Sequence, residues 1–384
     1  MKAAVLGYGT VGAGVYSMLS DAPGMEAGPV LVRPGKAVES FMVSDAALIF
    51  GDPTVDAVVE TLGRLDPAYS YGMRALEAGK HFITANKAMV ASHGLELAAL
   101  AREKGAAFLF SAACGGGVPF LHNLALSAET DRIEAVSGIL NGTTNYMLDA
   151  MQRRSLSYGD ALREAQSLGY AESDPTADVS GLDALRKMQL TCAVAFGVLP
   201  QSGMLCEGME HFTAADVEDI QSRGLVCRLL ARGSRAGESV SAYVEPVLFP
   251  RAAPESSVFT NNNMARYTGK RCGSIVLMGQ GAGRFPTASA VLRDLSAAQQ
   301  GACAMFPENC RAAEADNREA VHSYYIRTGG FAAVRLPLRS VLAQGEVVRA
   351  VTEPMSAEKM HALAQNIRKD GNDLFFAALE EELC

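Results

Sequence analysis

The fold of the first part of the chain is decided by the stretch Lys2-Ala3-Ala4-Val5-Leu6-Gly7-Tyr8-Gly9-Thr10-Val11-Gly12. It opens with an apolar run typical of a buried strand, and apolar residues recur at helical spacing after it. Between the two, the glycines follow the G-x-G-x-x-G pattern. There Gly7 permits a tight turn, Gly9 lets the backbone approach a pyrophosphate, and Gly12 lets helix and strand pack closely. The stretch predicts a dinucleotide site at Gly7, Gly9, Thr10, Val11 and Gly12. The alternative is a turn without a ligand.

Beyond this turn, short apolar runs alternate with helical stretches as far as about residue 115. Strands are predicted over residues 29–32, 46–50, 56–61, 80–84 and 107–111, and helices over residues 67–78 and 92–104. Strands that alternate with helices form a parallel sheet covered on both faces. Residues 1–115 are therefore predicted to form a Rossmann-type dinucleotide-binding domain.

The pattern then changes to longer helices. Helices are predicted over residues 119–128, 144–153, 158–168, 181–195 and 287–299, and strands over residues 240–249 and 274–278. Further strand-like runs lie at 323–327, 347–352 and 374–379, with a helix at 356–369. The predicted fold class is α/β: the Rossmann-type domain, an α+β substrate and dimerisation domain over residues 116–300, and a short C-terminal tail domain over residues 301–384. Helix 287–300 is expected to pack back on the first domain.

The composition restricts the class of protein. Of the 384 residues, 49% are hydrophobic and 20% are charged, which allows a large core. No apolar run approaches the ~18 residues of a membrane-spanning helix. The N-terminus lacks the apolar region of a signal peptide, which predicts a cytoplasmic protein without a membrane partner. The net charge of −8 and the scattered basic residues predict no nucleic-acid partner. Eight cysteines without a C-x-x-C pair are typical of reduced thiols.

The predicted second strand ends in Val32-Arg33-Pro34, with Lys36 just beyond. An acidic residue is usual there and binds the 2′-hydroxyl of the adenosine ribose. A cation suits a 2′-phosphate instead, so Arg33 favours NADP over NAD. The alternative is a solvated arginine on a short loop.

Two later segments have compositions that folding alone does not explain. Residues 139–146, Ile-Leu-Asn-Gly-Thr-Thr-Asn-Tyr, place small and polar residues between two helical regions. Residues 169–178, Gly-Tyr-Ala-Glu-Ser-Asp-Pro-Thr-Ala-Asp, end a helix with glycine and then gather three carboxylates. The helix that follows carries Asp183 and Lys187.

On these residues the sequence resembles the homoserine dehydrogenase family. The matching pieces are residues 7–12, 84–87, 138–146, 169–187, 281–283 and 286–290, in family order over roughly residues 1–300. The resemblance implies reversible hydride transfer between a nicotinamide and the aldehyde carbon of aspartate 4-semialdehyde, which gives L-homoserine for threonine and methionine biosynthesis. It also implies a homodimer, which the apolar helix pattern of residues 119–136 favours.

Reduction of a carbonyl leaves an alkoxide that must be protonated or neutralised as it forms, and a lysine ammonium does both. Lys187 matches the family's catalytic lysine. The alternative is an ion pair of Lys187 with Asp183, four residues earlier, on a helix surface. Asp183 matches a substrate-binding carboxylate, and its alternative is the third residue of a helix capped by Ser180.

The resemblance implies roles for further residues. Glu172 would bind the substrate amino group, with a solvated loop carboxylate as the alternative. Asp178 is as consistent with stabilising its loop as with binding substrate. Thr143 and Gly142 would donate hydrogen bonds to the substrate, or simply form a tight entry into a helix.

The resemblance assigns one lysine and one glycine, Lys87 and Gly283, to the cofactor side of the site. Lys87 resembles a family lysine between nicotinamide and substrate, and it is predicted just past the carboxyl end of a strand, where such sites form. Gly283, in the second glycine cluster, would close over the cofactor, and on its own it would be only a turn.

The resemblance is incomplete in two places. The family commonly has a glutamate where this chain has Ser111, and Cys114 and Gly116 fall where backbone carbonyls hold Na⁺ or K⁺. The glutamate's loss puts that cation in doubt. Many members also carry a C-terminal regulatory domain of the ACT type. Residues 301–384 are a candidate for a reduced or diverged version, so threonine feedback stays open.

Two rival functions remain. An acylating aldehyde dehydrogenase would use Cys114 as its nucleophile, although no histidine has an obvious activating relation to it. A non-catalytic nucleotide-sensing protein would keep the fold without the chemistry. The presence of Lys187, Lys87 and Glu172 argues against a sensor.

Overall fold

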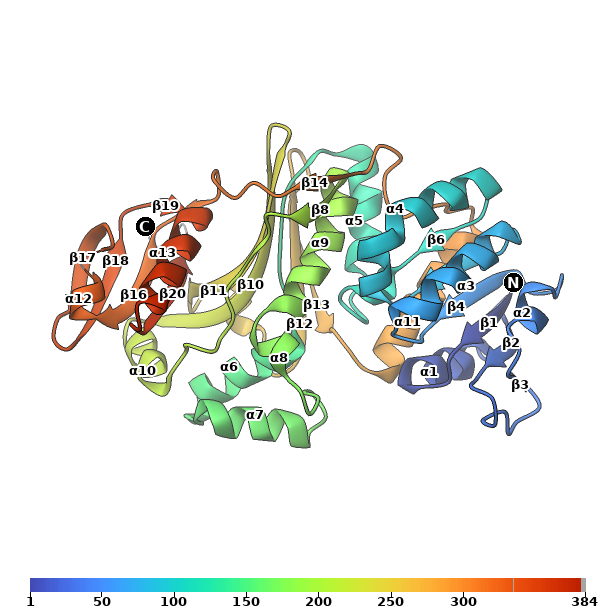
Figure 1. Ribbon diagram of the computed structural model, residues 1–384, viewed down its shortest axis with the longest axis horizontal. Coiled ribbons are helices and arrows are strands. Elements are labelled where there is room, and N and C mark those ends of the chain that lie inside the picture. The colour runs from blue at the N-terminus through green and yellow to red at the C-terminus, as the bar shows by residue number, and fades with distance from the viewer. Residues whose placement is uncertain (334, 381–384) are drawn as a thin grey trace. The chain divides into compact units, whose positions relative to one another are not determined.

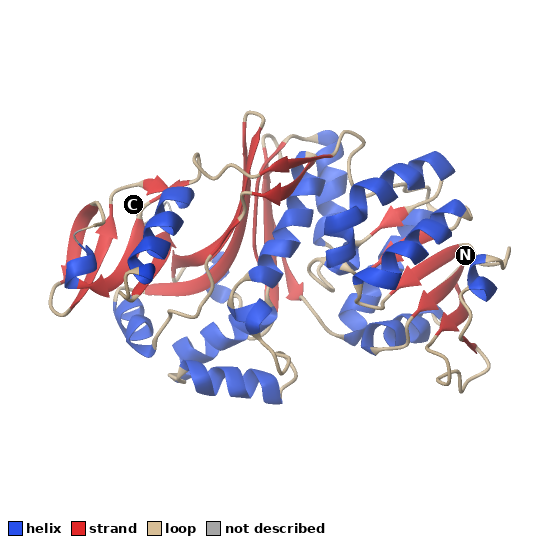
Figure 2. Cartoon of the chain, in the orientation of Figure 1, coloured by secondary structure: helices blue, strands red, loops and turns tan. Residues whose placement is uncertain are grey.

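The structure, a computed structural model, describes residues 1–333 and 335–380. Within this part the chain forms two compact units. The first unit consists of segments 1–133, 189–199 and 279–311, and the second of segments 134–188, 200–278 and 312–380. Each unit has its own sheet, as Figures 1 and 2 show.

The first unit is built on a six-stranded sheet with the order β3-β2-β1-β4-β5-β6, in which all neighbouring strands are parallel (Figure 1). Its strands are β1 (Lys2–Leu6), β2 (Glu26–Leu31), β3 (Met42–Val43), β4 (Ala57–Glu60), β5 (His81–Thr84) and β6 (Phe108–Leu109). Its helices are α1 (Thr10–Leu19), α2 (Ala47–Phe50), α3 (Leu65–Glu77), α4 (Lys87–Lys104), α5 (Phe120–Thr130) and α11 (Arg284–Gln299), with the 3₁₀ turn η1 (Ser111–Ala113). This strand order is that of the doubly wound dinucleotide-binding fold, and the predicted α/β class is confirmed.

The strand predicted over residues 46–50 is wrong, because this segment is the one-turn helix α2. A short apolar run fits either state, and periodicity over so few residues does not separate them. Asp45 stabilises the start of this turn, since its carboxylate accepts a hydrogen bond from the backbone N–H of Ala47 at 2.8 Å. Ile49 and Phe50 are then buried on one side of the turn.

The second unit is built on a ten-stranded sheet with the path β13-β12-β7-β10-β11-β20-β16-β18-β17, and a short strand β9 beside β11. Its strands are β7 (Ile133–Ile139), β9 (Leu205–Cys206), β10 (Leu225–Ala236), β11 (Ser239–Pro250), β12 (Asn262–Gly269), β13 (Gly273–Gln280), β16 (Tyr324–Gly329), β17 (Leu338–Ala343), β18 (Val347–Thr352) and β20 (Leu374–Leu379). Its helices are α6 (Gly142–Arg154), α7 (Tyr158–Ser167), α8 (Thr176–Val179), α10 (Ala214–Ser222), α12 (Gly330–Ala333) and α13 (Ala357–Lys369), with η2 (Pro254–Ser257).

Three further elements complete the described chain. Helix α9 (Leu182–Phe196) begins in the second unit. Two-stranded ribbons pair β8 (Val198–Ser202) with β14 (Arg311–Glu314), and β15 (Val321–His322) with β19 (Met355–Ser356).

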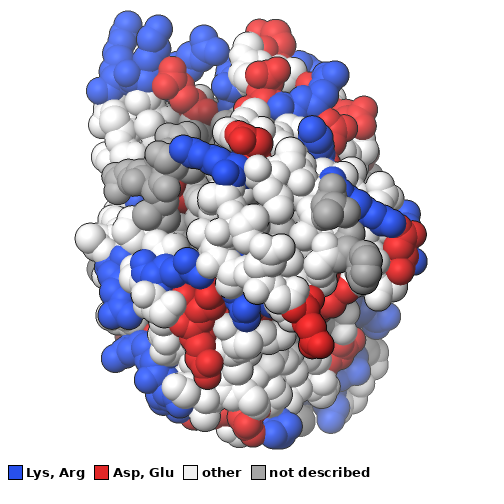
Figure 3. Space-filling model, turned by 90° about the vertical axis from the view of Figure 1, so that its left-hand side faces the viewer, with Lys and Arg blue, Asp and Glu red and all other residues white. Residues whose placement is uncertain are grey.

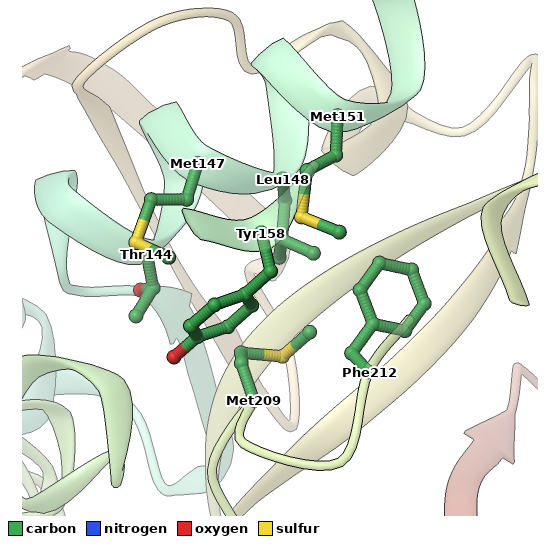
Figure 4. A pocket seen from close by; sticks show the side chains of 7 residues that line it. All are labelled: Thr144, Met147, Leu148, Met151, Tyr158, Met209 and Phe212. Carbon is green, nitrogen blue, oxygen red and sulfur yellow. The ribbon is translucent and has the colours of Figure 1, made fainter. Parts of the chain in front are cut away.

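A pocket lined largely by apolar side chains lies between α6, the start of α7 and the loop after β9 (Figure 4). Figure 4 shows Thr144 and three further residues of α6 facing Tyr158 of α7 and two residues of the loop after β9. The lining residues are Thr144, Met147, Leu148, Met151, Tyr158, Met209 and Phe212. Burial in these surroundings raises the pKa of Tyr158 to about 12. This packing fixes α6, whose first turn carries candidate site residues.

Residues 324–379 form a βαββαβ module of β16, α12, β17, β18, α13 and β20. Its four strands have the order β20-β16-β18-β17 with antiparallel neighbours. This is the ferredoxin-like arrangement. The strands predicted at 347–352 and 374–379 correspond to β18 and β20, whereas β17 was missed. The module is not separate from the larger sheet, because β20 pairs with β11 in parallel.

No described helix combines the length and the apolar character needed to cross a bilayer. On the face drawn in Figure 3, basic and acidic side chains both occur, in several places side by side, with uncharged surface around them. Seven of the eight cysteines lie in the described chain, and all seven are free thiols. Cys384 lies outside the described residues.

Candidate active site

The glycine turn lies between β1 and α1 in the first unit. Gly7 has φ +100°, a conformation that suits glycine, and its N–H donates to the carbonyl of Leu31 at 3.0 Å. A Cβ added at Gly12 would lie 2.1 Å from the carbonyl oxygen of Gly7, so only glycine fits there. A Cβ added at Gly9 would meet nothing within 4 Å. The turn is therefore closed on its inner side and open at Gly9, where Thr10 and Val11 begin α1 and leave N–H groups for an anion.

The carboxyl ends of β4 and β5 carry a buried polar network that sequence reasoning missed. Glu60 is 0% exposed, and its carboxylate accepts from the Thr84 hydroxyl and the Leu62 N–H, both at 2.6 Å. Burial raises the pKa of Glu60, which these hydrogen bonds partly oppose. Asn86 caps α4 with its side chain, and Lys87 is the first residue of that helix. The network fixes the segment that presents Lys87 at the edge where dinucleotide sites form.

The second strand of this sheet ends as the sequence predicts, although its neighbour is short. Arg33 follows β2 and is exposed, and β3 consists of only two residues. The chain runs from β2 to β3 without a helix. Arg33 therefore lies just past the carboxyl end of β2, and its contact with the adenosine end of a dinucleotide stays a prediction.

A second glycine segment belongs to the same unit. Gly283 has φ +118° and caps α11, and the Arg284 guanidinium donates to the carbonyl of Ala13 in α1 at 3.3 Å. Gly116 has φ +52°, and a Cβ there would lie 2.4 Å from the backbone of Gly281. The backbone at Gly116 therefore packs directly against the backbone at Gly281.

Cys114, the neighbour of that segment, is 1% exposed, and its sulfur lies 3.7 Å from the Thr191 hydroxyl. No group of three His, Cys, Asp or Glu side chains suited to a metal occurs among the described residues. A cation at the carbonyls of Cys114 and Gly116 would use other ligands, so that site stays a prediction.

Ser111, which stands where the family commonly has glutamate, is held by a carboxylate from elsewhere in the chain. Its N–H donates to Asp294 Oδ2 of α11 at 2.8 Å, and Asp294 is 0% exposed. Burial raises the pKa of Asp294 to about 7. Asp294 was not predicted, because 183 positions separate it from Ser111.

The raised pKa of Asp294 leads us to expect that the stability of the fold depends on pH. Its pKa rises from 3.8 in the unfolded chain to about 7 in the fold, so its contribution is full below 3.8 and is lost as pH rises to about 7. The loss has an upper bound of about 4 kcal/mol. Asp294→Asn is expected to flatten the fall in Tm across this range, which thermal unfolding at a series of pH values would measure. An unchanged slope in the variant would contradict this assignment.

Lys187 and Asp183 of α9 form the centre of the candidate site in the second unit. Lys187 Nζ lies 2.7 Å from Asp183 Oδ2, and the two side chains are only 12% and 14% exposed. The same ammonium donates to the carbonyl oxygen of Leu140 at 2.6 Å. The predicted ion pair between Lys187 and Asp183 is present, but it is not on the helix surface, because both side chains are largely buried and the ammonium is also bound to the backbone between β7 and α6. The interpretation of Ser180 as a cap is wrong, because its buried hydroxyl has no hydrogen-bond partner among the described residues.

Asn141 joins the two candidate carboxylates, and sequence reasoning missed its role. Its Nδ2 donates to Asp178 Oδ1 at 2.7 Å and to Asp183 Oδ2 at 3.0 Å. Its Oδ1 accepts from the Thr144 N–H at 2.8 Å and so caps α6. Burial raises the pKa of Asp178, and the charge of Asp183 adds to this. The only signal in the sequence was an asparagine placed directly before the start of a helix.

Gly142 and Thr143 form the first turn of α6 beside this cluster. A Cβ at Gly142 would lie 2.7 Å from the carbonyl oxygen of Asn261, which explains the glycine. The Thr143 hydroxyl donates to the carbonyl of Tyr170 at 2.6 Å. Thr143 thereby ties α6 to the carboxylate-rich loop, and the N-terminus of α6 offers a favourable dipole to an anion.

Glu172 is not brought into the cluster. Its side chain is exposed, and in the described part of the chain its carboxylate makes no hydrogen bond or ion pair. Its backbone carbonyl accepts from Gln166 Nε2 at 3.1 Å, which holds the loop to α7. The role of Glu172 in binding the substrate amino group therefore stays a prediction.

Comparison with known proteins bears on both units of the chain. Residues 7–111 match the model of the homoserine dehydrogenase NAD-binding domain, and residues 119–296 match that of homoserine dehydrogenase. A homoserine dehydrogenase of Synechocystis sp. is 37% identical over 319 residues, 77% of this chain and 72% of the relative. One from Corynebacterium glutamicum is 38% identical over 76% of this chain and 70% of the relative.

Solved structures of homoserine dehydrogenases are also similar to this chain. A homoserine dehydrogenase from Thiobacillus denitrificans has a TM-score of 0.87 at 28% identity and covers 99% of this chain and 98% of its own. The S. aureus enzyme at pH 8.5 has a TM-score of 0.77 at 26% identity, with 99% of both chains covered. A hyperthermophilic archaeal homoserine dehydrogenase in complex with NADPH has a TM-score of 0.67 at 24% identity and covers 81% of this chain and 99% of its own, which supports the fold. These matches favour neither the acylating dehydrogenase nor the sensor. Because the two family models together match residues 7–111 and 119–296, and the relatives are 37% and 38% identical over about three quarters of this chain, the chain belongs to the homoserine dehydrogenase family.

Proposed function

We propose that the chain interconverts L-aspartate 4-semialdehyde and L-homoserine with a nicotinamide dinucleotide, and that Lys187 transfers the proton. The observation that carries this proposal is the placement of Lys187 Nζ between Asp183 Oδ2 and the Leu140 carbonyl, at 2.7 and 2.6 Å. A cation held at a fixed place can meet the charge that develops on a reacting oxygen without reorganising.

Reduction of the aldehyde adds a hydride to its carbon and a proton to its oxygen. A nicotinamide dinucleotide held at the glycine turn would supply the hydride in this direction and would accept it in the reverse one. The ammonium of Lys187 gives its proton to the carbonyl oxygen as the C–O bond becomes single, and the amine takes a proton from the hydroxyl during oxidation. Asp183 stabilises the charged form of Lys187 and fixes its position. Lys87, at the start of α4, is proposed as the second lysine of the site.

The remaining groups match the charges of an amino acid. The carboxylates of Glu172, Asp178 and Asp183 are proposed to bind the substrate ammonium. Backbone N–H groups of Gly142 and Thr143, at the N-terminus of α6, are proposed to bind its carboxylate. The Thr143 hydroxyl already donates to Tyr170, so Thr143 contributes its backbone rather than its side chain.

The proposal is tested by following nicotinamide reduction with purified protein and L-homoserine, using NADP and NAD in turn. Turnover with L-homoserine is expected, and 4-hydroxybutanoate, which lacks the ammonium, is expected to be a much poorer substrate. Folded protein that reduces neither cofactor would overturn the proposal. Equal rates with both alcohols would leave a dehydrogenase without the proposed ammonium site.

Arg33 is proposed to favour NADP over NAD. Arg33→Ala is expected to raise KM for NADP by roughly 10-fold or more, because a charge-assisted hydrogen bond to phosphate is lost, and to leave KM for NAD unchanged. Steady-state kinetics with both cofactors measure the change. Lys104→Ala, at the far end of α4, is the control. An equal rise in KM for both cofactors would refute a role in selecting the 2′-phosphate.

The other predicted properties are kept as proposals. A homodimer is consistent with apolar residues that are exposed on β13, namely Ile275, Val276 and Met278 at 37%, 41% and 58%.

We propose that residues 324–379 are the counterpart of the regulatory domain in other family members, on the ground of their ferredoxin-like topology. The Na⁺ or K⁺ site, the cytoplasmic location and the place in threonine and methionine biosynthesis stay predictions.

A further inference from the structure

Asn263 of β12 shares a hydrogen-bond acceptor with Lys187. Its Nδ2 donates to the carbonyl oxygen of Leu140 at 3.0 Å, and Lys187 Nζ donates to the same oxygen at 2.6 Å. Leu140 lies between the end of β7 and the start of α6, outside both elements. The two side-chain donors therefore hold the carbonyl of Leu140 from β12 and from α9.

The buried side-chain amide of Asn263 lowers the stability of the fold. The residue is 2% exposed, and its Oδ1 is buried without a hydrogen-bond partner among the described residues. A buried polar atom that lacks a partner lowers stability, and such atoms in a native fold call for an explanation. A leucine has nearly the same shape and would avoid the cost. What leucine lacks is the N–H donor to Leu140.

We infer that Asn263 is a positioning residue for Lys187 and acts through the carbonyl of Leu140. The inference rests on the proposed function of Lys187. The Asn263 N–H fixes the Leu140 peptide, and so it fixes the point from which the ammonium reaches the substrate oxygen. The Asn263 N–H and the Lys187 ammonium also donate to the same carbonyl oxygen. Each hydrogen bond weakens the other, so the Asn263 N–H limits how strongly that oxygen stabilises the charged form of Lys187.

Asn145 provides a matched comparison in the same unit. It is 1% exposed, and its Oδ1 is also buried without a partner among the described residues. Its Nδ2 donates to the carbonyls of Val258, Thr260 and Asn262, at 3.0–3.2 Å. Asn145 thus holds a loop through three hydrogen bonds, whereas Asn263 makes one hydrogen bond beside the candidate catalytic lysine.

The experiment compares full-length wild type, Asn263→Leu and Asn145→Leu by thermal unfolding and by the pH profile of L-homoserine oxidation. Asn263→Leu is expected to keep or raise Tm, because it removes an unsatisfied amide, and to lower kcat/KM by roughly 10- to 100-fold. The acidic limb of its profile is expected to move to higher pH, since Leu140 then stabilises the ammonium more strongly. Asn145→Leu is expected to lower Tm and leave that limb in place.

The outcomes are distinguishable from failure of the proposed function. If wild type oxidises L-homoserine but Asn263→Leu keeps wild-type kcat/KM and the same limb, this inference is overturned and the proposed function stands. If Asn263→Leu loses Tm and activity without a shifted limb, as a structural residue would, the inference is also overturned. Asn263→Ala, which removes the donor without adding bulk, is used if the leucine variant does not fold, and the same shift of the limb is expected.

Discussion

Lys187→Ala is expected to lower kcat for L-homoserine oxidation by roughly 10²–10⁴-fold, the usual contribution of a positioned general acid or base. The variant removes the proton-transferring group and the cation beside the developing alkoxide. It also leaves Asp183, whose side chain is 14% exposed, without the partner that lies 2.7 Å away. Steady-state kinetics with saturating cofactor measure the loss, and calorimetric titration checks that the dinucleotide still binds.

The neighbour Arg186 supplies the control on the same helix. Its side chain is exposed, so Arg186→Ala removes a cation from α9 without touching the cluster. Activity near that of wild type is expected for it. Lys187→Arg adds a second comparison, because arginine keeps the charge but does not release its proton at accessible pH. If Lys187→Ala kept most of the wild-type kcat, the lysine would be a structural residue and another group would move the proton.

Gly12→Ala is expected to abolish dinucleotide binding and to destabilise the first unit by about 1–3 kcal/mol or more. The added Cβ would lie 2.1 Å from the carbonyl oxygen of Gly7 and 2.8 Å from the Thr61 hydroxyl, so the turn would have to open. Opening the turn moves the first N–H groups of α1 away from the position of a pyrophosphate. Thermal unfolding and calorimetric titration with both dinucleotides measure the two effects.

Gly9→Ala is a variant that separates an effect on dinucleotide binding from an effect on the stability of the fold. The residue has an extended backbone that alanine adopts, and its Cβ would meet nothing within 4 Å. Stability close to that of wild type is therefore expected. Dinucleotide affinity is expected to fall by roughly 10- to 100-fold, because the methyl group occupies space proposed for the pyrophosphate. Unimpaired binding by Gly9→Ala would show that the open space beside Gly9 is not the phosphate site.

The parts of the site that the sequence predicts are those determined by neighbouring residues. The glycine turn is a local pattern, and β1, Gly7 and α1 have the predicted order and conformation. Asp183 and Lys187 meet because four residues along a helix place side chains on the same face. The strands at 56–61 and 80–84 are found because each is a short apolar run between polar boundaries.

The parts that escaped prediction depend on contacts between distant residues. Asn263 and Leu140 are 123 positions apart, and nothing local to β12 marks that asparagine as polar and buried. β10 was missed because arginines interrupt its apolar run. Arg228 is buried nonetheless, because its guanidinium donates to three backbone carbonyls, and Arg232 pairs with Glu380 at 2.7 Å. Satisfaction of a buried charge by distant partners is a property of the folded chain.

The position of β20 determines when the second unit can complete its fold during synthesis. β20 lies between β11 and β16, and all of its residues are buried, yet it is the last of the ten strands to leave the ribosome. Until then the nascent chain holds two partial sheets with unpaired edges. Open strand edges recruit other chains, so this interval is the one in which the protein is most exposed to aggregation. A chaperone that covers β11 and β16 would protect it until residues 374–379 arrive.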